Sequence, residues 1–122
     1  MIEGVVTDAR EAVLDLLVWG PEGRQREIEA VIDTGFSGYL TVTPGLASEL
    51  GLVFEGQARA TLADGSQTMF PYYGVSVRWD GQDRYVEAGA ADTTPLVGMR
   101  LLENHSLFME IEDGGRVVIE AR

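Results

Sequence analysis

Short runs of alternating apolar and polar residues, each ended by a turn sequence, are the feature that most constrains the fold of this chain. In residues 25–32, apolar side chains occupy alternate positions, and Glu27 and Glu29 lie on the opposite side, which is the period of a half-buried strand. Similar runs are separated by the turn sequences Gly20-Pro21-Glu22-Gly23, Ala63-Asp64-Gly65-Ser66, Asp80-Gly81-Gln82-Asp83 and Asp113-Gly114-Gly115. The pattern predicts an all-β domain built largely from hairpins.

The predicted elements are three hairpins, a few short strands and one or two short helices. The hairpins join residues 13–19 to 25–32, residues 58–62 to 68–79, and residues 107–111 to 117–120; further strand-like runs are 39–42, 84–87 and 96–98. Residues 44–50 are predicted to form a helix, because Thr43 suits the N-cap, Pro44 the first helical position and Gly51 the stop. We expect one or two more helical turns in residues 99–104.

The length of the chain predicts a single domain over residues 1–122. A chain of 122 residues, 45% of them hydrophobic, can bury one core but has no room for a second lobe. No apolar run approaches the ~20 residues of a membrane span, and the first residues lack the basic and apolar regions of a signal peptide. We therefore expect a cytoplasmic protein that binds no membrane.

The composition excludes several kinds of chemistry. Cysteine and lysine are absent, which removes thiol nucleophiles, disulfides, thiolate metal sites, Schiff bases and the P-loop lysine. His105 is the single histidine, so a histidine-rich metal site is impossible, and we expect His105 to lie in a surface turn. A formal net charge of −11 with nine arginines argues against nucleic-acid binding. We expect neither a metal nor a cofactor.

Asp33-Thr34-Gly35 is the strongest candidate for a reactive site. It follows the strand-like run 25–32 and opens a glycine-rich turn. Thr34 can turn its hydroxyl toward neighbouring backbone, and Gly35 presents an N–H with no Cβ in the way, so the loop can hold Asp33 ionised and oriented. The same triplet also suits an ordinary turn, because all three residue types favour turns.

Three reaction classes can be compared for this segment. Gly35-Phe36-Ser37-Gly38 resembles a nucleophile elbow, but the last glycine comes one position early, and the following helix and a histidine base are missing. Phosphoaspartate chemistry requires a lysine, a second aspartate and magnesium in an α/β fold. Hydrolysis by paired carboxylates fits better: two close carboxylates share one proton, so that one activates a water while the other protonates the substrate carbonyl.

The chain supplies one such carboxylate, so the pair requires a second copy. The most similar segment elsewhere in the chain, Asp92-Thr93-Thr94, lacks the glycine and precedes Pro95 rather than a strand. An isologous two-fold interface brings the same residue of both chains together. The predicted catalytic pair is therefore Asp33 and its symmetry mate in a homodimer.

With these features, the sequence resembles the retropepsin-like aspartic proteases (clan AA), and more narrowly their small prokaryotic single-domain members. The resemblance spans nearly the whole chain and is carried, in order, by Asp33-Thr34-Gly35, Leu40-Thr41-Val42, the hairpin tip Ala63-Asp64-Gly65-Ser66, and Leu96-Val97-Gly98-Met99 leading into Leu101-Leu102. It implies a closed β fold with one or two short helices, in which Leu96-Val97-Gly98 packs against the catalytic loop.

The resemblance also implies an aspartic endopeptidase that acts as a homodimer on peptide or protein substrates. In that family Asp33 would be catalytic, Thr34 would form a hydrogen-bonded grip between subunits, and Gly35 would help hold the carboxylates and the substrate. The hairpin tip, Ala63, Asp64, Gly65 and Ser66, would belong to a flap that closes over the peptide and excludes water. Terminal strands near residues 2–7 and 117–121 would help form the dimer sheet.

Several side chains keep two interpretations. Phe36 replaces the small residue that the family places after the glycine, and either fills the core, which we favour, or lines a substrate pocket. Tyr72 and Tyr73 either reach the cleft or, as we favour, form a cross-strand packing pair. Asp64 is favoured as a turn former over a substrate contact.

A second function remains open beside the protease, because a fold does not determine its function. The alternative is a catalytically silent binding or assembly module with the retropepsin fold. The intact Asp33-Thr34-Gly35 favours the enzyme, since a silent copy could lose the aspartate without cost to folding.

Overall fold

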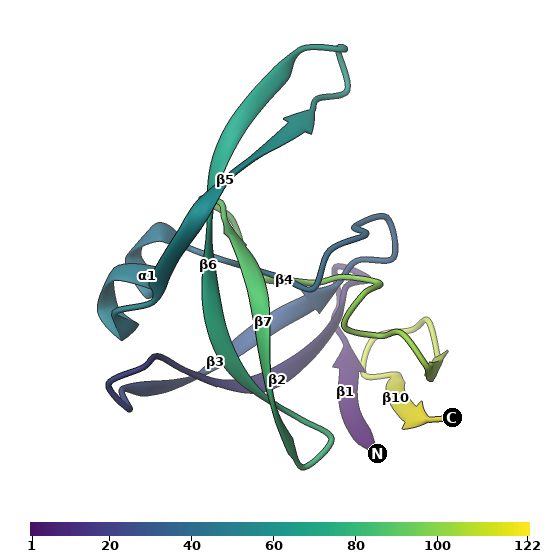
Figure 1. Ribbon diagram of the computed structural model, residues 1–122. Helices are drawn as coiled ribbons and strands as arrows, with labels where there is room; N and C mark the ends of the chain where they lie inside the picture. Colours follow the sequence, from purple (N-terminus) through teal and green to yellow (C-terminus); the bar gives the residue numbers. More distant parts are fainter.

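A computed structural model describes residues 1–122 as ten strands and one helix (Figure 1). The strands are β1 (Ile2–Val6), β2 (Ala12–Trp19), β3 (Gln25–Ile32), β4 (Leu40–Val42), β5 (Val53–Thr61), β6 (Gln67–Trp79), β7 (Gln82–Ala90), β8 (Leu96–Val97), β9 (His105–Met109) and β10 (Arg116–Ala121), and the helix is α1 (Pro44–Leu50). All three predicted hairpins are present, as β2–β3, β5–β6 and β9–β10.

Hydrogen bonds join the strands in the order β5-β6-β7-β4-β8-β3-β2-β1-β10-β9. A further pairing of β6 with β2, at Val18↔Val77 and Trp19↔Ser76, closes the segment from β6 to β2 into a six-stranded barrel. The β5–β6 hairpin rises well above the barrel, and the two chain termini lie together at its lower end (Figure 1). The predicted closed all-β fold is confirmed.

Alternation along the strands produces the core that the sequence predicts. In β3, Ile28, Ala30 and Ile32 are buried, whereas Glu27 and Glu29 are exposed. Buried side chains from the barrel, α1 and the terminal strands form a continuous cluster of 24 apolar residues. No polar or charged residue is buried, so packing of apolar surface is the main source of stability here.

The single helix has the predicted ends. Thr43 Oγ1 accepts a hydrogen bond from the Leu46 N–H (3.1 Å), which satisfies one free donor of the first turn. Gly51 ends the helix with a left-handed φ of 62°, a conformation that glycine adopts without a steric penalty.

No helix has the length and apolar character needed to cross a membrane.

No helix forms over residues 99–104, and of the one or two helical turns expected there only the turn that begins at Gly98 is present. The segment forms successive turns instead, in which Gly98 O accepts from the N–H groups of Leu101 (3.2 Å) and Leu102 (3.3 Å). Asn104 has a left-handed φ of 66° and directs the chain into β9 at the next residue. The connection is therefore too short for a continuous helix.

His105 lies in a strand and not in the surface turn that we expected. It is the first residue of β9 and pairs with Ala121 of β10. The Trp79 Nε1–H donates to His105 Nε2 (3.2 Å), and His105 Nδ1 lies 2.8 Å from the Glu103 carbonyl oxygen. An indole N–H only donates and a carbonyl only accepts, which assigns the histidine proton to Nδ1.

This contact leads to a prediction about stability. Trp79 is only 2% exposed, so replacing His105 by Phe leaves a buried indole N–H without an acceptor, at a cost of about 1–2 kcal/mol of unfolding free energy. His105→Gln is the matched control, because its side-chain oxygen can still accept. Urea unfolding should show the Phe variant to be the less stable. Equal stability of the two variants would contradict the role of this hydrogen bond.

Candidate active site

Asp33 lies directly after the last residue of β3, which is the position that the sequence predicts for it. Its Oδ1 accepts a hydrogen bond from the Gly35 N–H (2.9 Å), and its backbone N–H donates to Val97 O (2.9 Å). The carbonyl of Asp33 accepts from the Phe36 N–H (3.1 Å). Asp33 is half-buried and Gly35 is exposed. The loop thus holds the carboxylate in a defined orientation and leaves it accessible.

The two-residue strand β8 holds both ends of the Asp33 loop. It pairs in parallel with β3, at Val31↔Leu96 and Ile32↔Val97, and antiparallel with β4, at Leu40↔Val97. Residues 36–39 are then joined to the segment after β8 by three backbone hydrogen bonds: Met99 N–H to Phe36 O (2.8 Å), Arg100 N–H to Gly38 O (3.1 Å) and Gly98 N–H to Tyr39 O (3.0 Å). The loop is therefore fixed by the fold along most of its length.

Gly98 allows this close approach. A Cβ at this position would lie 2.1 Å from Gly38 O and 2.6 Å from the Phe36 ring, well inside contact distance. The Phe36 ring also lies against Gly38, where an added Cβ would be 2.6 Å from two ring atoms. Phe36 is half-buried and lines a cavity, and it is not among the side chains that form the core or pack against it, so the favoured interpretation as a core residue is wrong.

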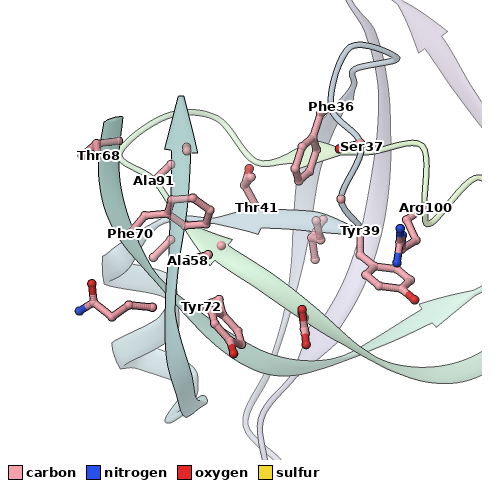
Figure 2. Close-up of a pocket in the computed structure, with 17 residues that line it drawn as sticks. Phe36, Ser37, Tyr39, Thr41, Ala58, Thr68, Phe70, Tyr72, Ala91 and Arg100 are labelled. Carbon is pink, nitrogen blue, oxygen red and sulfur yellow. The ribbon is translucent and has the colours of Figure 1, made fainter. Parts of the chain in front are cut away.

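The cavity, of about 810 Å³, lies between the loop after Asp33 and the β5–β6 hairpin (Figure 2). This volume is within the range of ligand-binding pockets. Lining residues from the loop and β4 include Phe36, Ser37, Gly38, Tyr39 and Thr41; those from the hairpin include Gln57, Ala58, Thr68, Phe70 and Tyr72; others include Glu87, Gly89 and Arg100. Asp33-Thr34-Gly35 begins the loop but does not line this cavity.

The four hairpin-tip residues predicted to bind substrate lie beyond the cavity. Ala63, Asp64, Gly65 and Ser66 are exposed and do not line it, and their contact with a substrate stays a prediction. Asp64 is a turn former, as favoured, because its Oδ1 accepts from the Ser66 N–H (2.9 Å) and hydroxyl (2.6 Å).

Residues farther down the hairpin face the cavity, and sequence reasoning identified only one of them. Ala58 and Ala60 on β5, and Thr68, Phe70 and Tyr72 on β6, line it at every second position. Tyr73 points to the opposite face, where it packs edge-to-face with Phe54 at 5.9 Å between ring centroids and contacts the core. The two tyrosines are thus not a packing pair. The two-residue period of β6 was the signal that could have found these positions.

The hairpin tip should respond to acid. Hydrogen bonds from the Ser66 side chain and backbone lower the pKa of Asp64 below its ordinary value of 3.8. A lowered pKa means that the bonds stabilise the tip above the ordinary pKa and are lost as the pH falls through the lowered one. We expect the Ser66 amide resonance in NMR spectra to shift with a midpoint below pH 3.8. Asp64→Asn should abolish this shift, and a midpoint above 3.8 would contradict the turn.

Charged groups in the cavity are few. Arg100 and Glu87 line it, together with the hydroxyl-bearing Tyr39. The guanidinium groups of Arg100 and Arg84 lie 5.9 and 6.0 Å from the centroid of the Tyr39 ring. No cluster of three or more His, Cys, Asp or Glu side chains is placed to hold a metal ion. The chemistry available at this site is therefore that of carboxylates, hydroxyls and a guanidinium.

Comparison with known proteins supports the fold. No family model matches the chain, and no curated protein matches it in sequence. The crystal structure of a retropepsin-like aspartic protease from Rickettsia conorii is similar over 99% of this chain and 90% of that chain, with a TM-score of 0.59 and 18% sequence identity. At this identity the similarity establishes the fold alone. The predicted retropepsin-like fold is confirmed.

Proposed function

We propose that this chain is an aspartic endopeptidase, active as a homodimer, that hydrolyses peptide bonds in peptide or protein substrates. The main support is the way in which Asp33 is held. Its carboxylate accepts the Gly35 N–H at 2.9 Å, its backbone is bonded to β8, and a cavity of about 810 Å³ lies beside the loop that follows it. A retropepsin-like fold with this triplet at the end of β3 is suited to acid–base hydrolysis.

In the proposed reaction, the Asp33 carboxyl groups of two copies share one proton, because two adjacent carboxylates cannot both ionise easily. The ionised carboxylate takes a proton from a water molecule, whose oxygen attacks the peptide carbonyl carbon. The other carboxyl protonates the carbonyl oxygen, which gives a tetrahedral diol. Collapse of the diol breaks the C–N bond. One hydroxyl proton of the diol returns to the second carboxylate, and the proton held by the first carboxyl passes to the leaving amine, so the pair again shares one proton.

The second copy is required because the chain has one Asp-Thr-Gly triplet. Thr34 and Gly35 are exposed in the single chain and therefore accessible to a partner. The terminal strands β1 and β10 pair with each other, and each has another neighbour on its outer side, β2 and β9 respectively. The open edge of this part of the sheet is β9, so we propose that a dimer sheet extends there, where backbone groups can pair.

This assignment predicts that activity depends on protein concentration. Peptide cleavage per mole of chain should fall on dilution, in parallel with the loss of dimer measured by sedimentation, because a single chain lacks the second carboxylate. Thr34→Ala removes a side chain proposed to contact the partner subunit. It should therefore raise the protein concentration at which half of the cleavage activity is lost and the concentration at which half of the dimer is lost. A protein that is monomeric at every concentration and yet cleaves at a constant specific rate would contradict the shared dyad.

A further inference from the structure

The end of the cavity next to Tyr39 carries the positive charge of an exposed arginine. The Arg100 side chain lines the cavity, while its backbone N–H is bonded to Gly38 O (3.1 Å). Its guanidinium lies over the Tyr39 ring at 5.9 Å from the centroid, within the range of a cation–π contact. Figure 2 shows Tyr39 and Arg100 at one end of the cavity and Phe70 and Thr68 at the other.

Arg100 has no carboxylate partner in the chain. Each of the five ion pairs involves another cation: the N-terminus, Arg24, Arg26, Arg78 or Arg116. Four other arginines also lack an ion pair, and Arg100 differs from them in lining this cavity. The guanidinium fork therefore has free donors that match the geometry of a carboxylate.

Two further charges affect the same end of the cavity. Arg84 approaches the same Tyr39 ring at 6.0 Å and donates a hydrogen bond to Leu101 O (3.4 Å), so a second guanidinium adds positive potential. Glu87 also lines the cavity and opposes them, but it forms no ion pair with either arginine within 4.0 Å. The balance near Tyr39 is two positive charges to one negative.

We propose that Tyr39 and Arg100 form a subsite that selects an acidic side chain of a bound peptide. The inference rests on the proposed function for the nature of the ligand, and it names a class of substrate: peptides that carry Asp or Glu near the cleaved bond, with apolar residues beside it. The apolar neighbours would contact Phe36, Phe70 and Ala58, which line the rest of the cavity. Arg100 is a specificity residue here and takes no part in the bond-breaking steps.

Binding to full-length Asp33→Asn protein tests the subsite without requiring cleavage. The probes are fluorescein-labelled decapeptides of identical sequence that carry Glu, Gln or Lys at one scanned position. At the best position, fluorescence anisotropy should show the Glu peptide to bind about fivefold more tightly than the Gln peptide, as expected for a solvent-accessible charge pair. The preference should decline as the salt concentration is raised.

Additional substitutions in the same protein identify the residue responsible. Arg100→Gln should abolish the Glu preference while leaving the affinity for the Gln peptide unchanged, and Arg100→Lys should retain part of the preference. Glu87→Gln should strengthen binding of the Glu peptide. Arg10→Gln removes the same charge from an exposed turn outside the cavity and should have no effect.

Failure of this inference can be told apart from failure of the proposed function. Equal affinity for Glu and Gln peptides at every position, no binding of any peptide, or a preference that survives Arg100→Gln would overturn the subsite. Wild-type protein that cleaves none of the peptides, while Arg100-dependent binding persists, would refute the endopeptidase and leave the subsite in place. Cleavage without a Glu preference would refute the subsite and leave the endopeptidase in place.

Discussion

Asparagine in place of Asp33 is expected to lower kcat/KM for peptide cleavage by at least about a thousandfold, as loss of a general acid–base pair does. The amide has nearly the same shape as the carboxylate, and its oxygen can still accept the Gly35 N–H that Asp33 Oδ1 accepts at 2.9 Å. It cannot take a proton from water, so the shared-proton pair is lost in both subunits. Folding and dimerisation should persist, because no packing contact changes.

Asp92 provides the matched control, because Asp92-Thr93-Thr94 is the nearest echo of the triplet and lies in an exposed turn. Asp92→Asn should cleave a mixed peptide library at the wild-type rate from acidic to neutral pH. If wild type and Asp33→Asn cleave equally, Asp33 is not catalytic. If neither cleaves at any pH while peptides still bind, the chain is the catalytically silent binding module that the fold alone also permits.

The parts of the fold that could be predicted from sequence are those with local causes. The hairpin from β2 to β3 follows from alternation and from Gly20-Pro21-Glu22-Gly23, and α1 follows from its Thr43 and Gly51 caps. Asp80 and Gly81, with φ values of 51° and 77°, form a two-residue turn that the Asp-Gly pair favours. In each case a few neighbouring residues determine the backbone conformation.

The predictions that failed or were missed involve contacts between distant residues. His105 belongs to β9 because it pairs with Ala121 and accepts from Trp79, which is 26 positions away. The barrel closes where Val18 meets Val77, and nothing near either residue in the sequence indicates that pairing. For the site, the sequence predicted the position of Asp33 but not the lining of the cavity, because the hairpin tip was expected to lie over the site.

Gly98 is where the catalytic loop is most sensitive to a small change. Alanine at this position is expected to reduce the unfolding free energy by about 3 kcal/mol, the upper part of the range for overpacking a closed site. Its methyl group would lie 2.1 Å from Gly38 O and 2.6 Å from the Phe36 ring, so the loop must move away from β8. Cleavage should fall with it, because the hydrogen bonds that position residues 36–39 are lost.

Gly45 provides the comparison within the same chain. It lies in α1, and a Cβ there would meet nothing within 4 Å, so Gly45→Ala should be neutral or stabilise the protein by up to about 1 kcal/mol through helix propensity. Urea unfolding of both variants, followed by tryptophan fluorescence, measures the difference. Both substitutions add one methyl group. A Gly98→Ala protein as stable as Gly45→Ala would therefore mean that β8 and the Asp33 loop are not in close contact. The mechanism that depends on a rigid Asp33 would then lose its structural basis.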